Sequence, residues 1–324
     1  MKLGRIVASL LSLGFLAGVL TETVWAQAYP SRPITIVVPY AAGGPTDAAA
    51  RLLAEHIRTA WKQTAVVDNR PGANALVGTL SVVRAAPDGY TLLFAGPSLP
   101  SYKALYKKPE VDVERELAPV SVVYVLPLII MVSAETPVST LAEFISYAKA
   151  RPGKLNYATS GSGMTLMIES LNQLAGIELL NVAYKGETPS ATALMRNEVQ
   201  MTFLSPVNAK GIAESGKAKA VSLSTATMRS RAMPEVRTAR EAGLQGYDQS
   251  AWFGILSPAN TPMEIRQAVA REISVFVKQP ETMSRFGKFG FEPASNSPEE
   301  FSRMITAEIA RYSEVAKKAK IEPE

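Results

Sequence analysis

Short apolar stretches recur along the chain and alternate with longer amphipathic ones. We predict strands in the apolar, mostly β-branched runs 34–38, 65–67, 91–94, 199–203, 220–223 and 253–256. Apolar residues are almost continuous in these runs, which is typical of strands covered on both faces. The apolar run from Val120 to Val132 is interrupted by Pro127, so it predicts two buried strands. Alternation of strands with helices predicts an α/β class with mixed, mainly parallel sheets flanked by helices.

Three helix starts are marked by a Ser or Thr followed three residues later by Glu, the sequence signature of a capping box. The pairs are Thr140 with Glu143, Thr261 with Glu264, and Ser297 with Glu300. In the last two, Pro262 and Pro298 stand at the first predicted helical position, where the missing N–H of proline costs nothing.

The first 28 residues predict a secretory signal peptide. Lys2 and Arg5 form a positive start, residues 6–20 are apolar, and Ala26-Gln27-Ala28 is a small-x-small cleavage signal. The apolar run is shorter than the ~20 residues that a membrane span needs, so we expect cleavage after Ala28 rather than an uncleaved anchor. The mature protein is therefore expected in the bacterial periplasm, which suits a chain without cysteine.

Composition excludes several classes of function. The chain has 324 residues, no cysteine and one histidine, so disulfides, thiolate metal sites, a Cys nucleophile and a His cluster for a metal ion are excluded. A Ser-His-Asp triad would have to use His56. The net charge of +5 is dispersed, without the basic stripe of a nucleic-acid binder, and weakly favours a small anionic ligand.

Two glycine-rich turns are candidates for binding a carboxylate. The first, PYAAGGPTDAAAR (residues 39–51), follows the strand at 34–38, and we expect Gly44 to cap a helix that begins at Pro45. A helix start leaves backbone N–H groups free, and its dipole makes that end partly positive. We expect Asp47 to reach back to the cap N–H. The alternative is an ordinary turn between a strand and a helix.

The second turn, LNYATSGSGMT (residues 155–165), precedes a helix predicted from Met164 to Ala175. It offers several hydroxyl groups, but it lacks the lysine of a phosphate-binding P-loop and the spacing of a dinucleotide fingerprint. Ligands of open α/β sheets bind beyond the carboxyl ends of the strands. We therefore place the two turns in different lobes and expect them to grip one ligand from two sides.

Further segments point to a known family. In order along nearly the whole mature chain, they are YPSRPITIVVPYAAGGPTDAAAR, DNRPGANALVG, PDGYTLLFAG, LNYATSGSG, YKGETPS, EVQMTF, EAGLQGYDQSAWFGILSP, SPEEF and the C-terminal AKIEPE. Together they resemble the Bug family of periplasmic solute receptors (TctC-like), which serve tripartite tricarboxylate transporters.

The resemblance implies the two-lobed, type II-like fold of periplasmic binding proteins, with a ligand cleft between the lobes. Lobe 1 would comprise residues 29–128 and 250–324, and lobe 2 residues 129–249. The implied function is that of a monomeric, non-catalytic receptor without cofactor or metal ion. It would capture a small organic carboxylate and deliver it to integral-membrane transporter subunits.

Two other functions stay open. One is a sensor that presents its ligand to a membrane signalling protein. The other is an exported hydrolase or isomerase, against which the absence of a Gly-x-Ser-x-Gly elbow counts.

The resemblance also implies a set of ligand-binding residues. In the family, the two turns hold a ligand carboxylate through backbone N–H groups, hydroxyls and ordered waters. We carry this role to Tyr40, Ala41, Gly43, Gly44, Thr46 and Asp47 in the first turn, to Ser160, Gly161, Ser162 and Gly163 in the second, and to Gly96, Pro97 and Ser98 after the strand at 91–94. Asp47 is expected to fix the loop and its waters rather than to contact the carboxylate.

The chain departs from the family at two positions. Members often carry Asp after the EVQMTF-like strand, where this chain has Leu204 followed by Ser205 and Pro206. They also often carry a His near the start of the helix after the second turn, where this chain reads Met164-Thr165-Leu166-Met167. A polar ligand group that faces Leu204 would lose a hydrogen bond worth about 1–3 kcal/mol. We therefore hypothesise an aromatic or aliphatic mono- or dicarboxylate, less polar than an amino acid or citrate. The alternative is that Leu204 only packs in the core.

Other conspicuous residues have ordinary explanations. His56 is expected at the surface or boundary of its helix rather than in catalysis, and Trp252-Phe253 in an apolar strand near the crossover rather than stacked on a ligand. Tyr184 is a candidate cleft residue, although a turn that exposes Lys185 explains its segment equally well.

Overall fold

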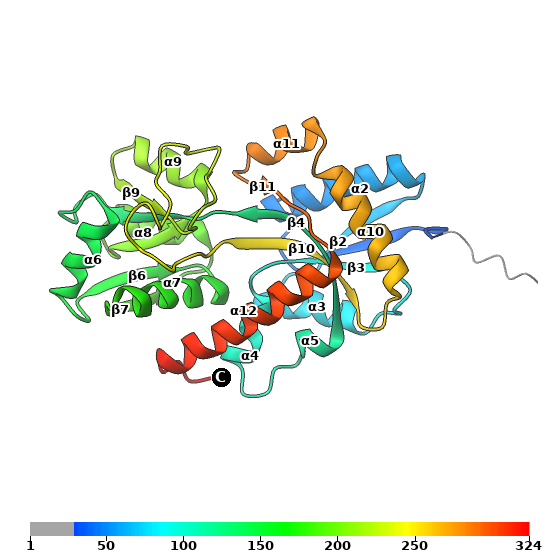
Figure 1. The fold of residues 1–324 in the computed structure, drawn as a ribbon, viewed down its shortest axis with the longest axis horizontal. Helices are drawn as coiled ribbons and strands as arrows, with labels where there is room; N and C mark the ends of the chain where they lie inside the picture. Colours follow the sequence, from blue (N-terminus) through cyan, green and yellow to red (C-terminus); the bar gives the residue numbers. More distant parts are fainter. Residues whose placement is uncertain (1–28, 324) are drawn as a thin grey trace, which may run out of the picture. The chain divides into compact units, whose positions relative to one another are not determined.

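The computed structural model describes residues 29–323, and the predicted signal peptide (residues 1–28) lies outside them. From Arg32 onward the chain forms one compact unit with two sheets (Figure 1). In spatial order, the six-stranded sheet contains β11 (Glu292–Pro293), β4 (Leu117–Leu126), β10 (Ala251–Pro258), β3 (Thr91–Ala95), β1 (Ile34–Val38) and β2 (Ala65–Asn69). The five-stranded sheet contains β7 (Leu179–Ala183), β6 (Leu155–Thr159), β8 (Met201–Leu204), β5 (Ile129–Ser133) and β9 (Ala218–Leu223).

The strands predicted from apolar runs are confirmed. Pro127 separates β4 from β5, as the interrupted run predicted, and every residue of β5 and β8 is buried. β8 begins at Met201 rather than at the predicted Val199.

The predicted class of mixed sheets flanked by helices is confirmed, but parallel pairing is less dominant than predicted. β1 pairs in parallel with β2 and β3, and β6 with β7 and β8. β10 is antiparallel to β3 and β4, β11 to β4, and β5 to β8 and β9. β4 carries the chain toward the second sheet and β10 brings it back. Because these two strands lie side by side, they must run in opposite directions.

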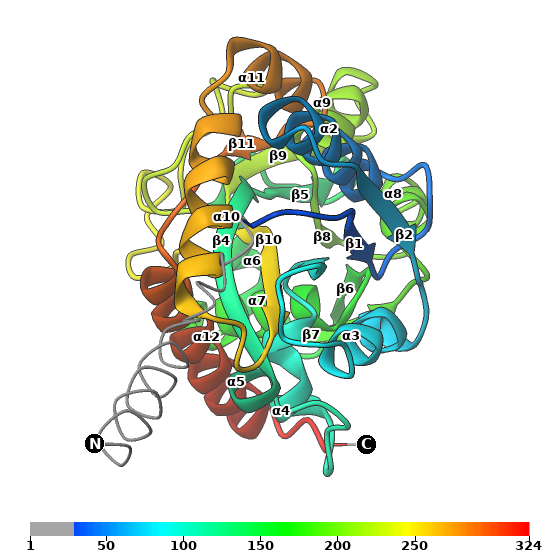
Figure 2. The same ribbon diagram turned by 90° about the vertical axis from the view of Figure 1, so that its right-hand side faces the viewer.

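Helices cover both sheets, and those of the six-stranded sheet include α10 and α12 over β4 (Figure 2). In chain order the helical segments are α2 (Pro45–Trp61), η1 (Ala73–Ala75), α3 (Leu76–Val83), η2 (Leu99–Ser101), α4 (Tyr102–Leu105), α5 (Val113–Glu116), α6 (Leu141–Lys149), α7 (Ser162–Ala175), α8 (Glu187–Met195), α9 (Pro206–Glu214), α10 (Met263–Phe276), α11 (Pro280–Gly287) and α12 (Pro298–Lys318). None of the helices described here is long and apolar enough to cross a membrane.

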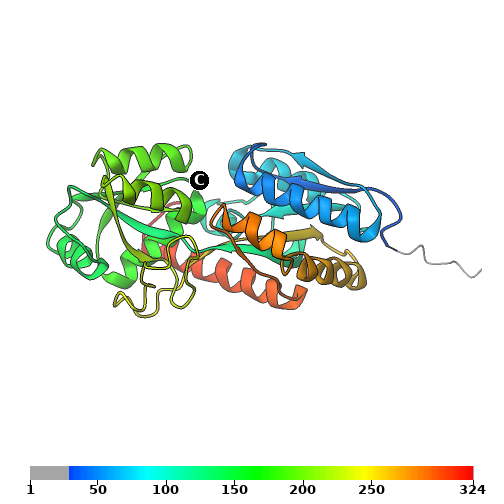
Figure 3. The same ribbon diagram turned by 90° about the horizontal axis from the view of Figure 1, so that it is seen from above.

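Helix α12 contributes to the cores of both sheets. Its first half places Phe301 and Ile305 in the core beside the six-stranded sheet, whereas Tyr312 and Val315 pack in the core beside the five-stranded sheet. Figures 1 and 3 show this red helix reaching toward α7, and Gln173 of α7 donates a hydrogen bond to the Val315 carbonyl (2.7 Å). The second half of α12 thus packs outside the lobe to which the sequence assigned it, and the lobe ranges stay a prediction.

Two of the three predicted helix caps are confirmed. The Thr140 hydroxyl accepts from the Glu143 N–H, and Ser297 forms a complete capping box with Glu300. The third is wrong: α10 begins at Met263, with Pro262 in the N-cap position. The Thr261 hydroxyl instead donates to the Pro258 carbonyl (2.8 Å), which lies closer in the preceding turn.

Close packing of α12 on β10 requires glycine at position 254. A Cβ on Gly254 would lie 2.7 Å from the Ser121 carbonyl oxygen and 2.7 Å from Cζ of Phe301. We expect Gly254→Ala to lower the free energy of unfolding by about 1–3 kcal/mol, measured by urea denaturation. The control is Gly211→Ala in α9, where a Cβ would meet nothing within 4 Å. It should be neutral or stabilising by up to about 1 kcal/mol. Equal stabilities of the two variants would contradict this packing argument.

Candidate functional site

The first glycine turn ends β1 and starts α2 as the sequence predicted. Gly44 is the N-cap in an extended conformation, and Pro45 is the first helical residue. Gly43 has φ of +81°, a left-handed conformation that favours glycine. The start of α2 therefore presents backbone N–H groups at an exposed turn, where the dipole of the helix favours an anion.

Asp47 is buried and stabilises this turn. Its carboxylate accepts from the Gly43 N–H (3.0 Å) and from Nε of Arg51 (2.9 Å), so it reaches the residue before the cap and not the predicted cap N–H. Burial alone would raise the pKa of Asp47, but hydrogen bonds from Arg51, Gly43 and Asn69 outweigh it and lower the pKa. The negative charge is thus engaged in holding the turn.

Tyr40 lies against the turn that follows β3. Burial raises the pKa of its hydroxyl to about 12, although hydrogen bonds with the Ser98 side chain and the Gly96 backbone act in the opposite direction. A Cβ on Gly96 would lie 2.7 Å from ring carbons of Phe253, so only glycine lets this turn come so close. The structure therefore brings together Tyr40, Gly96 and Ser98, which the sequence analysis had selected from separate segments.

The second glycine turn ends β6 and starts α7. Gly161 is the N-cap, and the helix begins at Ser162, two residues before the predicted start. A Cβ on Gly163 would lie 2.6 Å from the carbonyl oxygen of Pro97. The start of α7 therefore packs directly on the turn after β3.

Ser162 is the point at which the second turn is held. Its Oγ accepts a hydrogen bond from Nδ2 of Asn74 (2.6 Å) and forms another with Oγ of Ser101 (2.8 Å). Among the described residues no hydrogen bond runs directly between the two glycine turns, and the segment 96–101 contacts both of them.

The roles of Asn74 and Ser101 in holding Ser162 were not predicted from the sequence. Asn74 lies between Ala73 and Ala75, and all three have positive φ (44°, 52° and 73°). Such a run is rare without glycine, and asparagine tolerates it better than most residues. Asn74 lies inside the family-like segment DNRPGANALVG, but no role was predicted for it and nothing in the sequence links it to Ser162.

A pocket of about 330 Å³, here called the inter-sheet pocket, lies beside the start of α2. Strands β4 and β10 of the six-stranded sheet line it together with the starts of α8 and α9, which pack on the five-stranded sheet; the lining includes Thr46, Tyr124, Glu187, Ser205, Phe253 and Lys288. Thr46 and Ser205 belong to the predicted set. The ring of Tyr124 stacks between those of Phe253 (4.8 Å between centroids) and Phe291 (3.9 Å), which makes one wall apolar and rigid.

The remaining predicted residues lie around the five-stranded sheet. Leu204 is fully buried among residues such as Ile129 and Leu223, which favours the packing alternative. Tyr184 is half-buried against the same core, and Met164 is half-buried beside Ser160.

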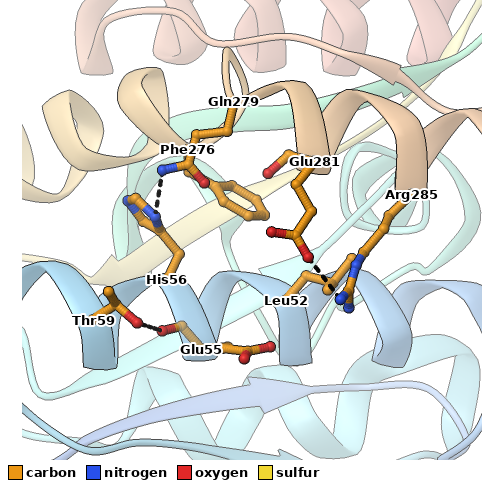
Figure 4. A pocket seen from close by; sticks show the side chains of 9 residues that line it. Leu52, Glu55, His56, Thr59, Phe276, Gln279, Glu281 and Arg285 are labelled. Carbon is orange, nitrogen blue, oxygen red and sulfur yellow. Dashed lines mark hydrogen bonds and ion pairs between the residues drawn. The ribbon is translucent and has the colours of Figure 1, made fainter.

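His56 lies in a different pocket, of about 180 Å³, between α2, α10 and α11 (Figure 4). Its Nε2 lies 2.6 Å from Oε1 of Glu272, and its Nδ1 lies 3.2 Å from Nε2 of Gln279. His56 is eleven residues beyond Pro45, the first residue of α2, which corresponds to ~16 Å along the helix and places His56 far from the first glycine turn. Both ring nitrogens thus bond to side chains of neighbouring helical segments, Glu272 and Gln279, and neither bonds to a hydroxyl that could act as a nucleophile.

The chain is similar to known receptors over most of its length. The family model described as "Tripartite tricarboxylate transporter family receptor" matches residues 49–321. BugT of Bordetella pertussis is 30% identical over 298 residues, which cover 91% of this chain and 91% of that protein. The chain therefore belongs to the tripartite tricarboxylate transporter receptor family, whose Bug members it resembles.

Solved structures agree with this assignment and with the predicted periplasmic-binding-protein fold. An R. palustris protein solved with adipate is 32% identical, with a TM-score of 0.77 and coverage of 91% of this chain and 100% of that one. MatC from Rhodopseudomonas palustris, solved with bound malate, is 30% identical, with a TM-score of 0.73 and coverage of 89% and 100%.

The hydrogen bonds of Asp47 predict a pH-dependent stability. Because its pKa is lower in the folded state, its contribution is present above the unfolded pKa near ~4 and is lost as the pH falls through the folded pKa. We expect Asp47→Asn to lower the free energy of unfolding by about 1–3 kcal/mol at pH 7, and this difference to shrink on acidification below pH ~4. Urea denaturation at several pH values measures it. A difference that is constant with pH would show that the charge of Asp47 does not stabilise the turn.

Proposed function

We propose that this chain is a periplasmic receptor that captures a small organic carboxylate between its two lobes and delivers it to a tripartite tricarboxylate-type membrane transporter. The observation that carries this proposal is that the segment 96–101 contacts both glycine turns, at Tyr40 in the turn that leads to α2 and at Gly163 in the start of α7. Adipate and malate, bound by relatives of this chain, are carboxylates of the expected size.

In this proposal the carboxylate oxygens accept hydrogen bonds from N–H groups of both helix starts. The contact residues are those predicted in the two turns and after β3: Tyr40, Ala41, Gly43, Gly44, Thr46, Gly96, Pro97, Ser98, Ser160, Gly161, Ser162 and Gly163, with Asp47 holding the first turn. Backbone donors at two helix ends stabilise a negative charge without a basic side chain. The ligand body is aromatic or aliphatic, as a mono- or dicarboxylate.

Lobe closure completes the cycle. One lobe comprises residues 29–128 and 250–324, and the other comprises residues 129–249. A ligand that contacts both lobes shifts the equilibrium toward the closed state only by as much as it binds that state more tightly than the open one. A micromolar dissociation constant, ~8 kcal/mol, suits scavenging of a dilute solute. Export depends on the signal peptide of residues 1–28, and its removal, which releases the mature protein, is tested by N-terminal sequencing.

Ligand binding is expected to stabilise the folded protein. With malate, adipate and benzoate as probes, at least one acid at a concentration of 100 times its dissociation constant should add about 2.7 kcal/mol. Thermal unfolding and calorimetric titration measure this effect.

The same titration tests the second turn. Gly163→Ala forces α7 away from the Pro97 carbonyl, so we expect affinity to fall at least ~10-fold, corresponding to ~1.4 kcal/mol. The matched control is His56→Ala, which lies outside the turns and should keep its affinity while losing about 1–3 kcal/mol of stability. If no acid stabilises the protein, or if Gly163→Ala binds as well as the parent, the proposal is wrong.

A further inference from the structure

In the proposed carboxylate receptor, the inter-sheet pocket is where the end of the ligand opposite its carboxylate would lie, and its residues would determine which group that end can carry. We propose that Glu187 and Lys288 select acids whose apolar body ends in a neutral group that both donates and accepts hydrogen bonds, a hydroxyl or a primary amide. This inference rests on the proposed function and narrows its class of ligands.

The pocket adjoins the end at which the ligand carboxylate is expected. Pro45 and Thr46, the first two residues of α2, line it. The hydroxyl of Thr46 lies 3.3 Å from that of Tyr124, so this side chain is held at the pocket wall. An acid whose carboxylate lies at the start of α2 therefore extends its other end into this pocket.

The wall of the pocket suits an apolar body. Phe253 and Phe289 are partly exposed there, and Leu126 lies beside them. Tyr124 is fully buried between Phe253 and Phe291, so the aromatic rings have little freedom to move. Rigid aromatic surface binds flat or aliphatic groups at a low cost in conformational entropy.

Glu187 supplies a fixed acceptor from the side of the five-stranded sheet. Its Oε1 accepts from the N–H of Ser205 (2.6 Å) and from the hydroxyl of Ser205 (2.8 Å). Both bonds involve the same oxygen, and within residues 29–323 no donor is bonded to Oε2. The carboxylate is thus oriented in advance and keeps one oxygen for a ligand donor.

Lys288 supplies a cation from the side of the six-stranded sheet. It follows α11 as its C-cap, lines the same pocket and is exposed. In the described part of the chain no carboxylate forms an ion pair with it.

The two opposite charges restrict the far end of the ligand. A second carboxylate would pair with Lys288 but lie against Glu187, and an ammonium group would pair with Glu187 but lie against Lys288, so the attraction of each charged group is offset by a repulsion. A group without hydrogen-bonding capacity would leave both side chains without a ligand partner. A hydroxyl or amide satisfies both, because it donates to Glu187 and accepts from Lys288.

Two matched series of acids test this inference by calorimetric titration of the mature protein. The aromatic series is benzoate, 4-hydroxybenzoate, terephthalate and 4-(aminomethyl)benzoate. The aliphatic series is hexanoate, 6-hydroxyhexanoate, adipate and 6-aminohexanoate. In at least one series we expect the hydroxy acid to bind about tenfold more tightly than each of its three counterparts.

Two variants assign the selectivity to its residues. Glu187→Gln should reduce the preference for the hydroxy acid over the dicarboxylate to less than about threefold. Lys288→Met should likewise reduce the preference for the hydroxy acid over the acid that carries an ammonium group. Controls are Glu214→Gln and Lys210→Met, exposed positions on α9 outside the pocket, which should leave all ratios unchanged.

The outcomes separate this inference from the proposed function. If acids bind but the hydroxy acid has no advantage, or if the variants leave the ratios unchanged, the selectivity is wrong and the carboxylate receptor stands. If a dicarboxylate or an amino acid binds most tightly, the selectivity is likewise overturned. If no acid of either series binds, and malate also fails, both proposals are wrong.

Discussion

The arrangement of the candidate site depends on how the turn after β3 holds the start of α7. Ser162 receives a hydrogen bond from Asn74 and shares another with Ser101, while Gly163 packs on the Pro97 carbonyl with no room for a Cβ. The same turn meets Tyr40 through Ser98 and Gly96. This short segment therefore holds the start of α7 directly and reaches the first turn at Tyr40, while Asp47 holds the start of α2. Each helix start can present its N–H groups to an anion.

The connections between the sheets determine what can move. β4 and β10 carry the chain across in opposite directions, and α12 packs into both cores. Closure of the two lobes would therefore bend two antiparallel strands and a long helix rather than a flexible linker.

Sequence alone was sufficient for the elements whose signals are local. Apolar runs located the strands, Pro127 located the break between β4 and β5, and Ser297 with Glu300 located the start of α12. Contacts between distant segments were not predictable, since neither Asn74 nor Ser101 differs in type from ordinary turn residues. A local motif can also mislead. Thr261 was predicted to cap α10, but its hydroxyl donates to the Pro258 carbonyl instead. Leu204 marked a departure from the family, but only the fold reveals Glu187 beside the next residue.

A crystal structure of the mature protein with a bound carboxylic acid tests the central claim most directly. The account predicts carboxylate oxygens within hydrogen-bonding distance of backbone N–H groups at the starts of both α2 and α7, directly or through one ordered water. An acid bound elsewhere, or held by only one of the two helix starts, would contradict it.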